Sequence, residues 1–371
     1  MNTVYINGKF TAQPTTGVQR AAHNTVAALD RLLQRQTAKS THWVLLCPDR
    51  RRAPTLQCIE TRVITGASML GLHGWEQLLL PWVTKGAPLL SLSGSAPWLK
   101  HVQACTFYDA AVFDRPGAYR RVFVWWYRFL FRRLAGKAAF VATVSEFSKG
   151  RLMEHLPLTL QRVALLGCGA DHFSAVTADG KVLMRLRLIP GHYFIVVGSA
   201  NVNKNHSAVV EAFTKLADRP DLKLVIVGSH RPEVFSRAEV LGTDARIVHA
   251  GAVDDASLKA LYEHAAALVF PSRYEGFGLP PLEAMSCGCP VITTRTAAIP
   301  ESCGEAPFYV EEACAPQLAE AMHRLAGDPS LRVALAHAGR RHSARFTWDA
   351  VASRLLSSVS SVHWTDDTRQ A

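Results

Sequence analysis

Short hydrophobic runs alternate with longer amphipathic stretches along most of the chain. The runs are five to seven residues long and rich in Val, Ile, Leu and Phe, which predicts β-strands. YFIVVGS and KLVIVGS are apolar almost throughout, as is typical of strands buried on both faces of a parallel sheet. The predicted strands are TVYIN (3–7), WVLLCP (43–48), PLLSLSG (88–94), ACTFYDA (104–110), FVATVS (140–145), YFIVVGS (193–199), KLVIVGS (223–229), RIVHAG (246–251), ALVFPS (267–272) and PVITT (290–294).

The stretches between these runs have helical periodicity. HSAVVEAFTKLAD (206–218) and DASLKALYEHAA (255–266) place apolar residues at i, i+3 and i+4. Strands that alternate with such helices predict an α/β fold with parallel sheets. At 371 residues, the chain is expected to form two domains. We therefore expect two Rossmann-like domains that face each other across a cleft.

The expected boundary lies near GCGADHFSAVTADG (167–180), before the second series of strands. We predict an N-terminal Rossmann-like domain over 1–172 and a C-terminal Rossmann-like domain over 173–345. Residues 346–371 begin as an amphipathic helix, expected to pack back toward the N-terminal domain, and end in a polar tail, TDDTRQA.

Charge divides the chain unevenly. The net charge is +11, and residues 1–170 hold 21 Lys and Arg against 8 Asp and Glu. This basic half favours an anionic partner such as nucleic acid, a membrane surface or a phosphorylated substrate. A solvated basic face without a partner is the alternative.

The remaining composition is that of a folded globular protein, with 49% hydrophobic and 19% charged residues. No apolar run reaches the roughly 20 residues of a membrane span, and the N-terminus lacks the pattern of a signal peptide. No pair of C-x-x-C motifs indicates zinc. Several of the cysteines lie in apolar context and indicate reduced thiols in a cytosolic protein. All eight cysteines of the chain are Cys47, Cys58, Cys105, Cys168, Cys287, Cys289, Cys303 and Cys314.

SRYEGFGLPPLEAMSCGCPV (272–291) carries the most specific chemistry. It follows a predicted strand, and ligands of open α/β sheets bind at the carboxyl ends of strands. Gly276 and Gly278 permit a sharp turn and close approach to a ligand, and two prolines suit the start of a helix. Free N–H groups there would bind a phosphate. Glu275 is expected at the exit of the strand and Glu283 in the first turn of the helix. The two carboxylates would then accept hydrogen bonds from sugar and ribose hydroxyls.

EGFGLPPLEAMSCGCPVI (275–292) resembles the E-x7-E signature of the retaining GT-B glycosyltransferases of family GT4. The resemblance extends in order over nearly the whole chain. The other matching segments are TTGVQRAAHNTVAALD (15–30), VATVSEFSKGRL (141–152), VGSANVNKNHSAVVEAF (197–213), GAVDDASLKALYEHAAALVFPS (251–272) and IPESCGEAPFYV (299–310).

The resemblance implies roles for particular residues. Glu283 would bind the nucleotide ribose, and Glu275 would approach the hydroxyls of the donor sugar. Lys204 would neutralise the diphosphate, as stabilisation of a phosphate leaving group requires. Gly17, with Arg20 as a weaker companion, would lie in a loop that approaches the diphosphate, and Val253 would contact the base. The backbone amides that would meet the diphosphate and sugar belong to Gly276, Phe277, Gly278 and Leu279.

Two positions depart from the family pattern. Asn203-Lys204 stands where Arg-Lys is common. Tyr108-Asp109 stands where a His-Asp dipeptide lies against the donor sugar, so Asp109 keeps its place while Tyr108 can only hydrogen-bond near neutral pH. The alternative for Asp109 is a cap after a strand.

The resemblance implies a metal-independent hexosyltransferase without a cofactor, whose nucleotide sugar is a co-substrate. GDP-mannose is the favoured donor, and the acceptor would be a saccharide or a polyprenyl-diphosphate-linked sugar of a bacterial surface polysaccharide. Retention would need no protein nucleophile, because the leaving phosphate assists the acceptor's deprotonation.

AYRRVFVWWYRFLFRRLAGK (118–137) interleaves arginines with aromatic residues. Such a helix can lie in a membrane interface, which would hold the enzyme peripherally on the inner face of the cytoplasmic membrane. The alternative is a domain helix with its aromatic side chains in the core.

Three other functions were weighed. A nucleotide-sugar epimerase of GT-B architecture would break the donor bond without an acceptor. A basic nucleic-acid-binding protein would need a reading helix or an RNP-like motif, which the sequence lacks. A nicotinamide dehydrogenase would need G-x-G-x-x-G after the first strand, TVYIN, and it is absent there.

Overall fold

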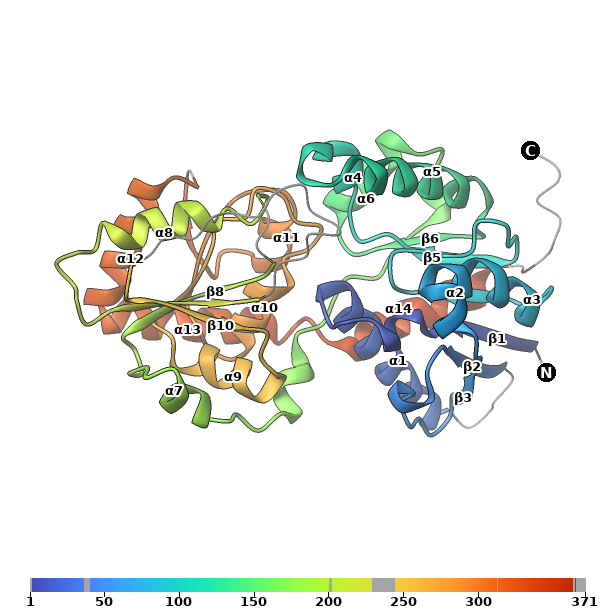
Figure 1. The fold of residues 1–371 in the computed structure, drawn as a ribbon, viewed down its shortest axis with the longest axis horizontal. Helices are drawn as coiled ribbons and strands as arrows, with labels where there is room; N and C mark the ends of the chain where they lie inside the picture. Colours follow the sequence, from blue (N-terminus) through green and yellow to red (C-terminus); the bar gives the residue numbers. More distant parts are fainter. Residues whose placement is uncertain are drawn as a thin grey trace. The chain divides into compact units, whose positions relative to one another are not determined.

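The computed structural model describes residues 2–36, 41–199, 202–228, 244–311, 313–362 and 364 (Figure 1). The chain forms two compact units. The first comprises residues 1–113, 125–169 and 347–371, and the second comprises 114–124 and 170–346. The predicted tail 365–371 and Ser229, at the end of KLVIVGS, lie outside the described residues.

The first unit contains a seven-stranded parallel sheet in the order β3-β2-β1-β4-β5-β6-β7. Its strands are β1 (Asn2–Asn7), β2 (Thr41–Cys47), β3 (Glu60–Val63), β4 (Leu89–Ser91), β5 (Gln103–Thr106), β6 (Val141–Thr143) and β7 (Val163–Leu165). The helical segments of the first unit are η1 (Gly8–Ala12), α1 (Gly17–Gln34), η2 (Arg50–Arg52), α2 (Ala67–Gly74), η3 (Trp75–Leu79), α3 (Leu80–Thr84), most of α4 (Ala111–Asp114) and α5 (Arg121–Lys137), α6 (Glu146–His155) and η5 (Leu160–Arg162), whereas η4 (Pro116–Ala118) belongs to the second unit.

The second unit repeats the design with six parallel strands in the order β10-β9-β8-β11-β12-β13. They are β8 (Tyr193–Val197), β9 (Lys223–Val227), β10 (Ile247–Gly251), β11 (Ala267–Phe270), β12 (Val291–Thr294) and β13 (Phe308–Val310). The helical segments are η6 (Asp171–Ala175), α7 (Lys181–Arg185), α8 (His206–Thr214), α9 (Asp255–His264), α10 (Leu279–Ser286), α11 (Ile299–Cys303), α12 (Ala315–Gly327) and α13 (Pro329–Ser343). Figure 1 shows α8 on one side of this sheet and α9 on the other.

The alternation of strands and helices is confirmed. Each of the ten predicted strands overlaps an observed strand, and both predicted helices are present as α8 and α9. The sequence analysis missed β3, β7 and β13, which are edge strands of three or four residues. They are shorter than the runs of five to seven residues from which the other strands were predicted.

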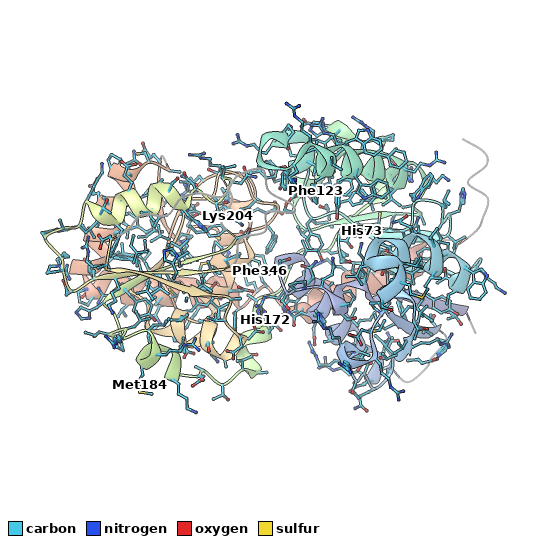
Figure 2. The ribbon with its side chains drawn as sticks, viewed as in Figure 1. His73, Phe123, His172, Met184, Lys204 and Phe346 are labelled. Carbon is cyan, nitrogen blue, oxygen red and sulfur yellow. The ribbon has the colours of Figure 1, made fainter. Side chains whose placement is uncertain are left out.

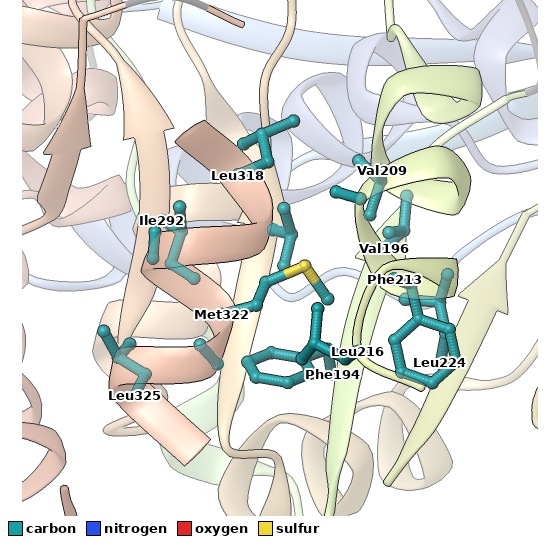
Figure 3. Close-up of a cluster of buried hydrophobic side chains, with 14 of the residues drawn as sticks. Phe194, Val196, Val209, Phe213, Leu216, Leu224, Ile292, Leu318, Met322 and Leu325 are labelled. Atoms are coloured by element: carbon teal, nitrogen blue, oxygen red, sulfur yellow. The ribbon is translucent and has the colours of Figure 1, made fainter. Parts of the chain in front are cut away.

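One face of the second sheet is covered by α8 and α12, which meet over a hydrophobic core (Figure 3). Phe194 and Val196 of β8 are almost fully buried there, as are Phe213 of α8 and Met322 of α12. The i, i+3, i+4 spacing read from residues 206–218 is the stripe that faces this core.

The C-terminal segment forms α14 (Trp348–Ser361), which packs against α1 within the first unit. Trp348 is buried, and Asp349 forms ion pairs with Arg31 at 2.8 Å and Arg35 at 3.2 Å. The described part of the chain has no helix that is both long enough and apolar enough to cross a membrane.

A buried ion pair lies at the carboxyl end of β1. Lys9 Nζ is 2.8 Å from Glu76 Oε2, and neither side chain is more than 2% exposed. Lys9 also donates to Ser95 at 3.1 Å, while Glu76 accepts from Asn7 and Ser95 at 2.9 Å each. Because β1 and β4 are neighbours, the network fills the crevice where the strand order of this sheet reverses.

We expect Glu76→Gln to destabilise the first unit by about 3–5 kcal/mol, because it leaves the Lys9 ammonium buried without its counter-charge. The double variant Lys9→Met/Glu76→Gln removes that charge and should recover most of the loss. Urea unfolding of wild type, Glu76→Gln, Lys9→Met and the double variant measures the coupling free energy between Lys9 and Glu76. A double variant that is destabilised by the sum of the two single changes would contradict this role.

Candidate functional site

The strand order of the second sheet reverses between β8 and β11. These strands are adjacent, although β9 and β10 lie between them in the sequence. The loops that follow them therefore leave in opposite directions and open a crevice at the carboxyl ends of the strands, where open α/β sheets bind ligands. Lys204 lies after β8, and Glu275 lies after β11.

Residues next to Lys204 hold it in place after β8. The alkyl chain of Lys204 runs over Gly198, where a Cβ would lie 3.4 Å from the lysine Cε. Asn205 has left-handed backbone (φ 56°) and is fully buried. Its side chain donates to the carbonyl of Ala313 at 2.9 Å and accepts from Arg273 at 2.9 Å. These two hydrogen bonds hold Asn205 in place directly before α8.

The loop after β11 is bonded to the first loop and carries the opposite charge. Ser272 Oγ and the Arg273 N–H both donate to the carbonyl of Asn203, at 2.9 and 2.7 Å. Glu275 Oε1 accepts from Lys204 Nζ and from Ser272 Oγ, at 2.5 Å each. The two charged side chains retain 19% and 13% of their exposure, so solvent still reaches this ion pair.

Gly278 starts α10 with left-handed backbone (φ 97°). A Cβ at this position would lie 2.6 Å from Ile299 Cδ1, so only glycine fits without a shift of the neighbouring helix. Pro280 and Pro281 occupy the first turn, as expected. The segment Gly276–Leu279 thus forms the start of α10 beside the crevice.

Glu283 lies one turn further into α10 than the sequence analysis placed it. The helix begins at Leu279, so Glu283 is in the second turn, and the expectation of a first-turn carboxylate was wrong because the helix starts before the prolines. Its side chain is 4% exposed, and Oε1 lies 3.2 Å from Nε2 of His172. His172 belongs to η6, and Figure 2 labels it. Its position in the boundary segment gave no sign of this contact.

The remaining predicted residues are distributed over both units. Val253 follows β10 in the second unit. Gly17 is the first residue of α1 in the first unit, where a Cβ would meet no atom within 4 Å. Asp109, also in the first unit, accepts from the Ala111 N–H at 2.9 Å, which is the capping contact considered as its alternative. Tyr108 donates to the carbonyl of Leu92 at 2.8 Å, and burial raises its pKa well above the ordinary value.

The structure therefore brings Lys204 and Glu275 into direct contact and places the Gly276–Leu279 segment and Glu283 on the same loop and helix. The roles of these residues toward a ligand stay predictions. Within the part of the chain that the structure describes, no three His, Cys, Asp or Glu side chains are grouped as metal ligands.

Residues 190–342 match the family described as Glycosyl transferases group 1. O-antigen chain mannosyltransferase B of Escherichia coli is 27% identical over 66% of this chain and 66% of its own length. MMP alpha-(1->4)-mannosyltransferase of Mycolicibacterium hassiacum is 28% identical over 62% of this chain and 56% of its own length. The chain thus matches somewhat less than two thirds of these relatives.

Among solved structures, sucrose-phosphate synthase of Thermosynechococcus elongatus superposes with a TM-score of 0.72. The match covers 97% of this chain and 98% of that one at 18% identity. Sequence identity this low supports a shared fold and not a shared activity. The predicted GT-B fold, with two parallel α/β units, is confirmed.

His206 is the first residue of α8, two positions after Lys204, and is 2% exposed. Burial, together with the positive charge of Lys204, lowers its pKa to about 4. The folded protein therefore keeps this imidazole neutral at a pH where the unfolded chain, with a pKa near 6.5, has already bound a proton.

This difference predicts a pH-dependent loss of stability. Below about pH 6.5 the unfolded chain binds more protons at this site than the folded one, so acidification favours unfolding, by about 2 kcal/mol at pH 5. His206→Leu should remove that part of the slope. Urea unfolding of both proteins between about pH 7 and about pH 5 measures it. Parallel pH profiles would show that His206 titrates normally in the folded protein.

Proposed function

Because residues 190–342 match the family described as Glycosyl transferases group 1, we propose that this protein is a retaining glycosyltransferase. It moves a hexose from a nucleotide-diphospho-sugar to a saccharide or a polyprenyl-diphosphate-linked oligosaccharide. The observation that carries the proposal is the solvent-accessible Lys204–Glu275 pair at the strand-order reversal of the second sheet.

The donor diphosphate is assigned to Lys204 and to the backbone at the starts of α8 and α10. Helix N-termini and a lysine ammonium together favour the two phosphate charges. Lys204 is paired with Glu275, so the ammonium lies at the strand-order reversal. The donor shares or replaces this contact, and the released carboxylate of Glu275 can accept hydrogen bonds from the sugar hydroxyls.

The nucleotide is assigned to the end of the crevice beyond this pair. Glu283 accepts hydrogen bonds from the ribose hydroxyls, and His172 holds the carboxylate in place through the 3.2 Å contact. Val253, after β10, contacts the base. Gly17 and Asp109 belong to the first unit, and their roles toward the diphosphate and the sugar stay predictions.

The reaction breaks the bond between the sugar C1 and the diphosphate oxygen and forms a bond from C1 to the acceptor hydroxyl oxygen. The hydroxyl proton passes to the departing phosphate, which serves as the base. The Lys204 ammonium stabilises the negative charge that develops on this leaving group. The proposed chemistry is metal-independent, since lysine and helix N-termini supply the positive potential that a divalent ion would otherwise provide.

Mannose from GDP-mannose is the proposed sugar, supported by the two related mannosyltransferases. The name of the E. coli relative, an O-antigen chain enzyme, supports a role in surface polysaccharide synthesis. The acceptor is assigned to the basic first unit, and a lipid-linked acceptor would place the enzyme peripherally on the inner face of the cytoplasmic membrane.

A thermal-shift panel of GDP, UDP, ADP and dTDP tests the donor. GDP should raise the melting temperature most, since a ligand at 100-fold its Kd adds about 2.7 kcal/mol of stability. NMR of the product formed from GDP-mannose and a lipid-linked saccharide should then show a retained anomeric configuration, with activity unchanged by EDTA.

Each part of the proposal has a contrary outcome. A larger shift with UDP than with GDP would mean that the donor carries uracil and not guanine. No shift with any nucleotide would mean that the protein has no donor site. An altered sugar released from the donor alone would indicate an epimerase. Activity lost to EDTA and restored by Mn²⁺ would overturn the metal-free chemistry.

A further inference from the structure

The segment from α2 to α3 exposes large apolar side chains. None of the residues of α2 is buried, and Met69 is 89% exposed. Leu78 of η3 and Trp82 of α3 are 60% and 74% exposed. The only Asp, Glu, Lys or Arg within residues 64–84 is Glu76, which is buried against Lys9. This segment, which we call the apolar ridge (67–84), therefore presents a surface without charge.

The apolar ridge continues into the loop after β4 and from there into α5. The side chain of Gln77 in η3 donates to the carbonyl of Ala96 at 3.1 Å and accepts from the Trp98 N–H at 3.0 Å. The Trp98 ring packs edge-on against Phe129 of α5, with centroids 5.6 Å apart. Leu99, next in the loop, is 51% exposed. One continuous part of the first unit thus carries all these side chains.

On α5 the apolar surface is bordered by positive charge. Trp125, Phe129, Arg133 and Lys137 follow one another at four-residue intervals, so they share one face of the helix. Trp125 is 68% exposed and stacks on Phe129, whereas Lys137 Nζ lies 3.3 Å from His101. Residues 61–145 hold ten Lys and Arg against three acidic residues.

We propose that the apolar ridge, together with Leu99 and the Trp125–Lys137 face of α5, docks on an anionic lipid bilayer. Exposed Met, Leu and Trp side chains enter the boundary between headgroups and acyl chains, and the bordering cations contact anionic headgroups. A second copy of the chain fits this surface less well, since a symmetric contact would bury Arg133 and Lys137 of both copies on a surface that offers no acidic partner. Nucleic acid would use the cations but not the apolar ridge.

This inference specifies the membrane contact that the proposed function needs for a lipid-linked acceptor, and it is tested without any transfer reaction. The test is sedimentation of the full chain with vesicles of phosphatidylcholine, alone or mixed with phosphatidylglycerol. Wild type should bind the mixed vesicles more strongly, and added salt should weaken this preference.

The apolar contribution is tested by Met69→Gln/Leu78→Gln/Trp82→Gln, at side chains exposed enough to leave the fold intact. Binding to mixed vesicles should fall about tenfold or more at every salt concentration, because the loss is one of apolar burial. The matched control is Met184→Gln/Ile189→Gln/Val333→Gln, at the large exposed apolar side chains of the second unit (Met184 in Figure 2). It should bind as wild type does.

The electrostatic contribution is tested by Arg133→Gln/Lys137→Gln against the control Lys181→Gln/Arg185→Gln. Each cation near an anionic membrane contributes about fivefold to binding at low salt, so the α5 variant should lose roughly thirtyfold there and little at high salt. Loss of the same size for both pairs would mean that overall charge, and not this face, binds the vesicles.

Vesicle binding by the apolar variant at the wild-type level would overturn the proposal. So would a wild-type protein that ignores vesicles but sediments as a dimer, which the apolar variant converts to monomers. A failure of the proposed function gives a different result from a failure of this inference. A protein that binds vesicles but no nucleotide would contradict the proposed function and still support the membrane surface.

Discussion

The second unit depends on the reversal of strand order between β8 and β11, because that reversal leaves one crevice at the carboxyl edge of its sheet. The two loops that flank it are bonded together through the carbonyl of Asn203, and each contributes one charge, Lys204 and Glu275. We propose that this ion pair marks the position at which the donor diphosphate binds. Gly278 and Asn205, with their left-handed backbone, keep both loops in that arrangement.

The first unit has the same strand order and the same kind of crevice, and it too contains a lysine and a glutamate there. The difference is burial. Lys9 and Glu76 are at most 2% exposed and are bonded to Ser95 and Asn7, so removing either partner would leave an uncompensated charge. Lys204 and Glu275 keep contact with solvent, which allows a charged ligand to exchange for one partner. The same kind of ion pair is thus buried in one unit, whereas in the other we propose that it binds the donor.

Much of the fold, and two carboxylates of the candidate site, could be predicted from the sequence. The central strands lie in apolar runs of five to seven residues, which are clear in the sequence, whereas β3, β7 and β13 are edge strands of only three or four residues. The E-x7-E spacing identified Glu275 and Glu283 because it places one carboxylate before α10 and one within it. The Lys204–Glu275 contact joins residues 71 positions apart, and the His172–Glu283 contact joins η6 to α10. Neither has a local pattern, because tertiary packing alone brings these residues together.

The central claim is that Lys204 binds the donor's terminal phosphate in the crevice between β8 and β11. Calorimetric titration of wild type and Lys204→Met with GDP and with GMP tests it most directly, because GMP lacks the phosphate that the lysine is proposed to meet. Loss of a charge-assisted hydrogen bond should weaken GDP binding by about tenfold to a hundredfold while leaving GMP binding nearly unchanged. An equal change for both nucleotides, or none for either, would contradict the account.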